Sequence, residues 1–71
     1  MNTFKPGDKV NYVPSHLLDD YGIEDMEPGV VTSVNDKYVF VRFHMKKKGI
    51  FIDKFRFTSI ACSPENLFPR Q

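Results

Sequence analysis

The chain has 71 residues, of which 41% are hydrophobic and 27% are charged, and its formal net charge is +1. This length predicts a single domain spanning residues 1–71, and the balanced composition excludes a disordered tail, an acidic DNA mimic and a generic polycation. One cysteine, Cys62, excludes an internal disulfide framework and fits a reducing compartment, so we expect a cytoplasmic protein. We expect no membrane association, because no apolar run approaches membrane-spanning length and Met1–Lys9 lacks the core of a signal peptide.

The first half of the chain predicts two strands separated by a long loop. The first strand covers Lys9–Val13, after the turn residues Pro6–Asp8 and before Pro14, which cannot donate a ladder hydrogen bond. The second strand covers about Gly29–Val34. Between them, Ser15–Pro28 shows neither strand alternation nor a strong helical period. A loop of this length in a small domain is commonly functional or mobile.

A hairpin is predicted next. Asn35–Lys37 forms its tight turn, since Asn and Asp tolerate left-handed backbone geometry and bond their own main chain. The returning strand covers Tyr38–Phe43 or slightly more, and places Val39, Val41 and Phe43 on one face. Apolar residues also occupy the other face, which is typical of a central strand covered from both sides.

After this hairpin the alternation is interrupted. His44–Gly49 contains three consecutive lysines and is predicted to break the strand pattern. Ile50–Thr58 resumes the pattern with Asp53 among its phenylalanines, so it is either two short strands around a bend or one bulged strand. A further short strand is predicted at Thr58–Cys62, where Cys62 is expected to be a small core residue.

The chain is predicted to end in a single helical turn. Ser63 is placed to cap it, and Pro64 occupies the first helical position, where the missing N–H costs nothing. Leu67 and Phe68 are then expected to plug the open end of the fold. Short strands punctuated by turn residues predict an all-β, five-stranded small closed barrel. The expected barrel core is Val10, Val30, Val39, Val41, Phe43 and Leu67.

This order of signals resembles the SH3-like small β-barrels, the broad group that includes KOW and Tudor modules. The matching residues are Gly7–Val10, Gly29–Val31, Tyr38–Phe43 and Pro64–Leu67. The resemblance implies a binding module, but barrels of this kind serve many unrelated functions.

A second resemblance is to small uncharacterised proteins of phage and prophage genomes. They share a Gly-Asp-x-Val-x-Tyr-Val-Pro opening, here Gly7–Pro14, and an Asn-Asp turn before Val-Phe-Val-Arg-Phe, here Asn35–Phe43. This resemblance implies a role in phage–host conflict, with a host enzyme or defence component as the protein that the domain inhibits.

Opposite charges are segregated along the chain. Ser15–Pro28 holds five carboxylates and neither Lys nor Arg, whereas Lys37–Arg56 holds seven basic side chains and only the carboxylate of Asp53. KOW modules that bind nucleic acid place basic and aromatic residues in the first of these loops, so the chain departs from their pattern. The segregated charges either belong to two solvated loops that resist aggregation, or they steer a charged partner toward the surface. The acidic loop supplies a secondary candidate surface: Asp19, Asp20, Tyr21, Glu24, Asp25 and Glu27.

The main candidate surface is the stretch Lys46–Phe57, which we call the basic–aromatic arm. Its binding residues are Lys46, Lys47, Lys48, Phe51, Lys54, Phe55, Arg56 and Phe57. This stretch has three interpretations. It could form a nucleic-acid groove, or a protein interface with apolar anchors inside a lysine rim, or its phenylalanines could simply belong to the core. We expect a protein partner, with nucleic acid and homo-oligomerisation as alternatives. At least one of the three phenylalanines is predicted to be exposed in the isolated chain.

Catalytic signals are sparse. His16 and His44 are the only histidines, and neither lies at a metal-ligand spacing with Cys62. The serines lack a nucleophile-elbow context, and the glycines are isolated rather than gathered in a phosphate-binding loop. The sequence therefore predicts a non-enzymatic module with no catalytic residues, no metal site and no cofactor.

Overall fold

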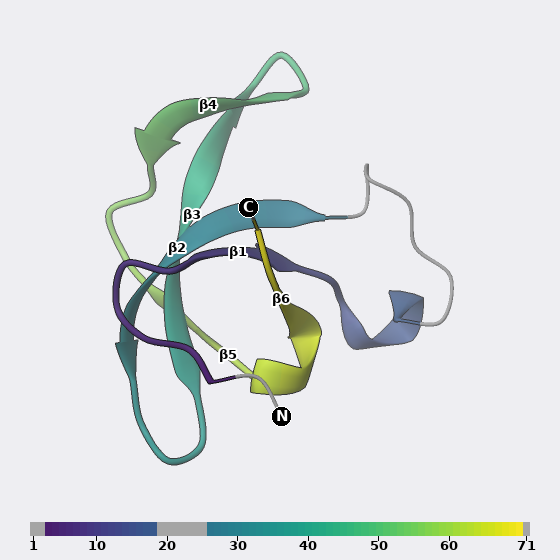
Figure 1. The fold of residues 1–71 in the computed structure, drawn as a ribbon. Helices are drawn as coiled ribbons and strands as arrows, with labels where there is room; N and C mark the ends of the chain where they lie inside the picture. Colours follow the sequence, from purple (N-terminus) through teal and green to yellow (C-terminus); the bar gives the residue numbers. More distant parts are fainter. Residues whose placement is uncertain (1–2, 19–25, 71) are drawn as a thin grey trace.

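The computed structural model describes residues 3–18 and 26–70 of the chain. In these ranges the fold is all-β, as the sequence predicts, with two 3-10 turns and no helix long and apolar enough to cross a membrane. Figure 1 shows the elements in chain order: β1 (Lys9–Tyr12), η1 (Ser15–Leu17), β2 (Glu27–Val34), β3 (Val39–Lys47), β4 (Ile50–Phe55), β5 (Ile60–Cys62), η3 (Pro64–Asn66) and β6 (Leu67–Pro69).

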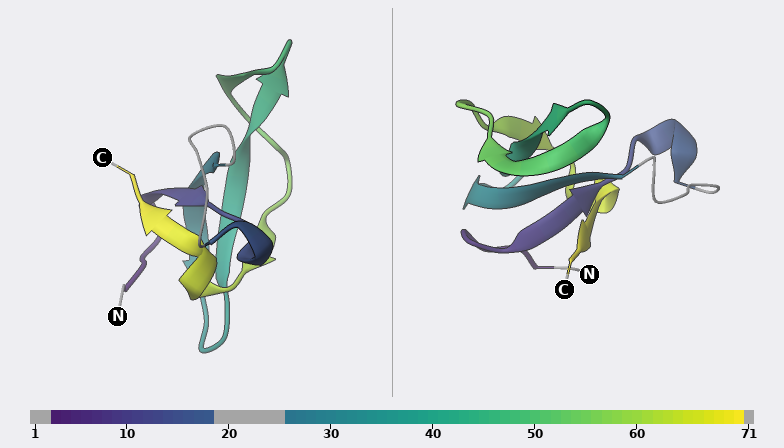
Figure 2. Two further views of the ribbon diagram at one scale, coloured as in Figure 1. Left: turned by 90° about the vertical axis from the view of Figure 1, so that its right-hand side faces the viewer. Right: turned by 90° about the horizontal axis from the view of Figure 1, so that it is seen from above.

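All the strands belong to one antiparallel sheet with the order β4-β3-β2-β1-β6, and β5 pairs with β3 beside this path. β3 divides one of its edges between two partners, because Val39–Val41 pair with β5 and His44–Lys47 pair with β4. Seen from above in Figure 2, the β3–β4 hairpin, β2, β1 and β6 follow one another across the molecule.

Two details of the predicted five-stranded closed barrel are wrong. The described chain forms six strands, and their pairing does not close into a ring. The additional strand is β6, where Leu67 pairs with Tyr12 and Phe68 pairs with Asn11. These two residues therefore extend the sheet and do not serve only as a plug. β6 was not predicted because it directly follows the turn η3 and ends in Pro69, so it shows little strand alternation in the sequence.

The predicted hairpin between β2 and β3 is present. The side chain of Asn35 accepts hydrogen bonds from the backbone N–H groups of Lys37, at 2.9 Å, and Tyr38, at 2.7 Å. These bonds close the turn in the way expected of an Asn at this position. A Cβ atom added at Gly29 of β2 would lie 2.5 Å from a side-chain carbon of Val41. The close approach of β2 to β3 therefore requires a glycine at this position.

The break predicted at His44–Gly49 is wrong, because β3 continues through Lys47. Lysine residues are compatible with an exposed strand, because their charged ends remain in water. The chain then reverses through Lys48 and Gly49, at φ values of 52° and 78°. Two consecutive residues in the left-handed region form the tight turn that suits the twist of a β-hairpin.

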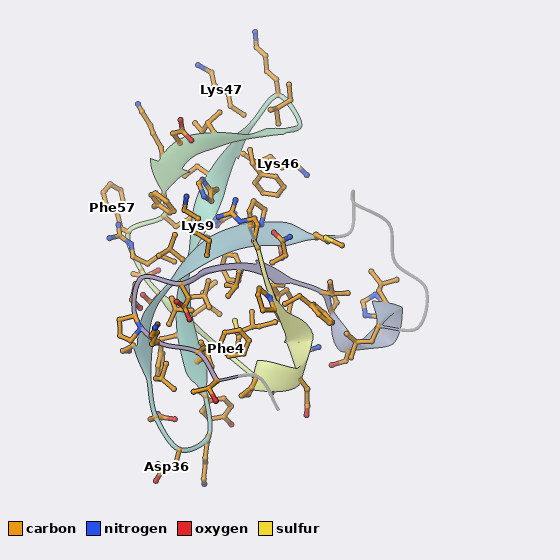
Figure 3. The ribbon with its side chains drawn as sticks, viewed as in Figure 1. Phe4, Lys9, Asp36, Lys46, Lys47 and Phe57 are labelled. Atoms are coloured by element: carbon orange, nitrogen blue, oxygen red, sulfur yellow. The ribbon has the colours of Figure 1, made fainter. Side chains whose placement is uncertain are left out.

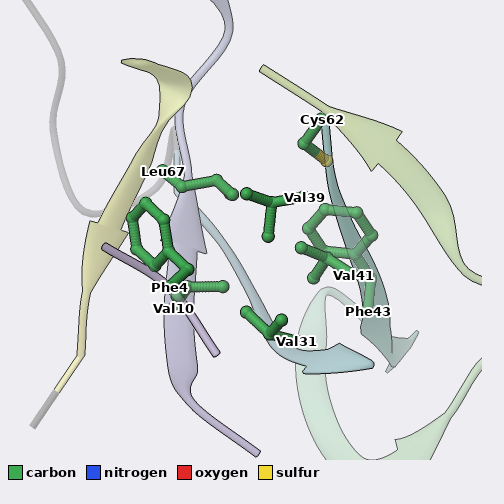
Figure 4. Packing of buried hydrophobic residues seen from close by; sticks show 8 residues of the cluster. All are labelled: Phe4, Val10, Val31, Val39, Val41, Phe43, Cys62 and Leu67. Atoms are coloured by element: carbon green, nitrogen blue, oxygen red, sulfur yellow. The ribbon is translucent and has the colours of Figure 1, made fainter. Parts of the chain in front are cut away.

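The core lies between the two halves of the bent sheet. In Figure 4, residues of β1 and β6 face residues of β3 and β5 across it, and Phe4 packs beside Leu67. The predicted members are confirmed with one exception, since Val30 is half-buried and pairs with Arg42. The residues of the buried cluster are Phe4, Val10, Val31, Val39, Val41, Phe43, Cys62 and Leu67.

The predicted helical turn is present as η3, with Pro64 in its first position. Ser63 precedes it but makes no side-chain capping hydrogen bond. The turn is held instead by Asn66, a buried polar residue whose Nδ2 donates to the Val13 carbonyl at 2.9 Å and contacts Ser15 Oγ at 3.0 Å. This network joins the end of β1 to the start of β6.

Candidate partner-binding surface

The basic–aromatic arm, Lys46–Phe57, occupies the end of β3, the reversing turn, β4 and the start of the connection to β5. In Figure 1 this hairpin projects beyond the rest of the sheet. Its register is Lys47 opposite Ile50 and Lys46 opposite Phe51, followed by a shift that brings Phe55 opposite His44. Of the two alternatives that the sequence leaves open for Ile50–Thr58, the structure shows the single strand with an irregular register, and this strand ends earlier than expected, at Phe55.

Two of the arm's aromatic rings are already engaged by side chains of β3. The Lys46 ammonium group lies 5.0 Å from the centre of the Phe51 ring, a cation–π contact. The Phe55 ring is tilted against the His44 ring, with 4.3 Å between their centres. His44 is itself held, because the Ile52 carbonyl accepts a hydrogen bond from its Nδ1 at 2.7 Å. Phe51 and Phe55 are therefore half-buried parts of the hairpin.

Phe57 differs from both of these rings. Its side chain is 94% exposed, and Figure 3 shows it pointing outward from the edge of the molecule. The prediction that at least one arm phenylalanine is exposed is confirmed for the isolated chain. The sequence predicts an exposed ring without identifying it, because the irregular register of β4 decides which ring stays against the sheet.

Hydrogen bonds hold the connection on both sides of Phe57, through the backbone of Arg56 and through the side chain of Ser59. The Arg56 N–H donates to the Phe43 carbonyl at 2.9 Å, and the Arg56 carbonyl accepts from Arg42 Nε at 2.9 Å. On the other side, the hydroxyls of Ser59 and Thr32 lie 2.7 Å apart and share a hydrogen bond. The exposed ring is thus presented by an ordered connection rather than by a frayed end.

The basic side chains of the arm lie at the solvent-exposed surface. Lys47, Lys48, Lys54 and Arg56 are all exposed, and none of them forms an ion pair with another residue in the part of the chain that the structure describes. Figure 3 shows Lys47 extending from the far end of the hairpin. The arm therefore carries both an exposed aromatic ring and unpaired cations, the kinds of side chain that form the apolar core and the polar rim of a protein interface.

The structure also contains a groove that the sequence does not predict. It has a volume of about 270 Å³ and is lined by Tyr12, Glu27, Phe43, Arg56, Ile60, Ala61 and Cys62. The Tyr12 ring meets the Phe43 ring edge-to-face with 5.9 Å between their centres, which gives the groove an aromatic floor. Its lining comes from four separate strands and the β4–β5 connection, so no local pattern marks it.

Cys62 is a buried core residue, as the sequence predicts. Burial, together with the negative charge of Glu27, raises the pKa of its thiol from 9.0 to about 11. The unfolded chain therefore loses this proton at lower pH than the folded chain does. The thiol's contribution to the free energy of unfolding is full below pH 9.0 and is lost as the pH rises to about 11.

We expect the parent protein to lose stability relative to Cys62→Ala as the pH rises through this interval. Urea unfolding of both proteins at several pH values measures the difference directly. Because all other titrating groups are common to the two proteins, their contributions cancel. A constant difference from neutral pH to about pH 11 would contradict a buried, protonated thiol.

Of the secondary acidic surface, Glu27 is exposed at the start of β2. Asp19, Asp20, Tyr21, Glu24 and Asp25 lie outside the described residues. Within residues 3–18 and 26–70, no group of three or more His, Cys, Asp or Glu side chains is placed to hold a metal ion.

Comparison with known proteins leaves the surface to be judged by its own geometry. No family model, no curated protein and no solved structure matches the chain.

Proposed function

We propose that the chain is a non-enzymatic, SH3-like binding module that acts through protein–protein contact at the basic–aromatic arm. The observation that carries this proposal is Phe57, a nearly fully exposed ring between the hydrogen-bonded backbone of Arg56 and the hydrogen-bonded side chain of Ser59. A large apolar side chain in this position loses favourable burial while the chain is alone, and a partner that covers it restores that burial.

The charges indicate the kind of partner. The lysines of the arm repel a second copy of the same surface, and they attract an acidic surface with an apolar recess for Phe57. Base stacking is less well supported, because the Phe51 ring is covered by Lys46 and the Phe55 ring packs against His44. The resemblance to phage proteins adds the proposal that the partner is a host enzyme or defence component.

Replacement of Phe57 by Ser should abolish association while changing the free energy of unfolding by no more than about 0.5 kcal/mol, because the ring makes no core contact. The assay is capture from a nuclease-treated bacterial lysate by immobilised parent and variant, followed by mass spectrometry. The matched control is Tyr38→Ser, which removes an aromatic ring that is 44% exposed on the β2–β3 hairpin.

Support requires a protein captured by the parent and by Tyr38→Ser but lost with Phe57→Ser. Equal capture by all three proteins would contradict the proposal. A titration with mixed DNA and RNA oligonucleotides near physiological salt tests the nucleic-acid alternative. If binding is tight, falls steeply with salt and is retained by Phe57→Ser, the partner is a nucleic acid bound through its phosphate backbone and not a protein.

A further inference from the structure

Three strands of the sheet have an edge with no strand partner among the described residues: β4, β5 and β6. A free edge can accept an added strand unless something blocks it. β4 carries a bulge and the charged pair Asp53 and Lys54, and β6 ends in Pro69. Bulges, charges, proline and very short strands all discourage strand addition. β5, Ile60–Cys62, is short, but it carries no bulge, no charge and no proline.

The edge of β5 also lies beside the groove described above. Ile60, Ala61 and Cys62 all line it, and Ile60 is 49% exposed. A strand placed along β5 would direct alternate side chains over the aromatic floor made by Tyr12 and Phe43. A volume of about 270 Å³ accommodates aliphatic side chains.

The two charged residues of the groove lie on different elements and give it a polarity. Arg56 lies in the β4–β5 connection, upstream of Ile60 in the chain. It also belongs to the basic–aromatic arm, which carries the other unpaired cations. Glu27 stands on β2, where it repels carboxylates. An antiparallel strand beside β5 would end near Arg56, because its direction opposes that of β5. Acidic residues are therefore favoured in the C-terminal part of such a strand.

We propose that β5 and its groove bind an extended peptide segment of a partner, with aliphatic residues beside Ile60–Cys62 and acidic residues toward Arg56. This inference rests on the proposed function and specifies how part of the partner is recognised. Main-chain pairing would supply affinity, and the groove and Arg56 would supply selectivity.

The test uses two synthetic peptides with acetylated and amidated ends, Val-Ile-Val-Asp-Glu-Asp and its charge-reversed form Val-Ile-Val-Lys-Arg-Lys. Each is titrated into isotope-labelled full-length chain while amide resonances are recorded. We expect saturable shifts at Tyr12 and Ile60–Cys62 with the acidic peptide. Affinity should fall about tenfold or more with the basic peptide and with Ile60→Ser. Val34→Ser is the matched control, since Val34 is a 42% exposed aliphatic residue outside the groove.

Shifts confined to Lys46–Lys48, equal affinity for the two peptides, or no saturable binding would overturn the inference. Its failure can be separated from that of the proposed function. If a protein captured by the parent is lost with Phe57→Ser but retained by Ile60→Ser, the arm binds the partner and the groove does not. If Ile60→Ser also loses it, the groove belongs to the interface.

Discussion

Truncation of Leu67 to Ala should lower the free energy of unfolding by about 2–5 kcal/mol. The side chain is 1% exposed and belongs to the buried cluster with Val10 and Val39. Its removal leaves a cavity between the two halves of the sheet, and the short strand β6 has few other contacts with which to compensate. Since small domains are stable by only about 5–15 kcal/mol, this single change takes a large share of the total.

Urea unfolding followed by circular dichroism measures the effect, with Val34→Ala as the control. Val34 is also an aliphatic strand residue, but it is exposed at the end of β2, so its truncation should change stability by no more than about 0.5 kcal/mol. Equal stability of Leu67→Ala and the parent would mean that β6 does not close over the core.

The second large effect is expected at Asn66. Its Nδ2 group donates to the Val13 carbonyl, and its own carbonyl accepts from the Val13 N–H at 2.9 Å. Replacement by Ala leaves the Val13 carbonyl without its side-chain donor and opens a gap next to Ser15. We expect a loss of about 1–3 kcal/mol, the usual penalty for a buried polar group that loses its partner.

An Asn66→Asp variant tests the direction of the hydrogen bond. The shape is preserved, but an ionised carboxylate faces a carbonyl instead of donating to it, so the loss should be at least as large as that of Asn66→Ala. Protonation at low pH restores a donor and should recover part of the lost stability relative to the parent. Glu65→Ala, one residue away and exposed, serves as the control. Full stability of Asn66→Ala would show that the network contributes nothing.

The parts of the fold that the sequence predicts are those with strong local signals. The Asn35 turn and the alternation of Val39, Val41 and Phe43 are confirmed because a central strand needs apolar residues wherever it faces the core. The prediction of Val30 as a core residue is wrong because Val30 and Val31 are adjacent and equally apolar, so alternation alone does not decide which of them faces inward. In the structure Val31 is buried opposite Val41, and Val30 lies on the other face, opposite Arg42.

The candidate surface was predictable only in part. Adjoining lysines and phenylalanines in the sequence predict the arm as the candidate surface, and the prediction that one of its rings is exposed is confirmed by Phe57. The sequence could not identify Phe57 itself, because that depends on Phe55 remaining against His44. The groove was missed altogether, because Tyr12, Glu27 and Ile60 are brought together only by the tertiary fold.

The pairing of β1 with β6 also has a consequence for biosynthesis. Val10 pairs with Pro69, so one edge of β1 waits for its neighbour until nearly all of the described chain has left the ribosome. The β2–β3 hairpin, whose strands are joined by a short turn, can form well before then. The free edge of β1 and the core residues that Leu67 covers therefore stay exposed in the nascent chain until β6 has left the ribosome. The core of this domain cannot be completed before Pro69 has been translated.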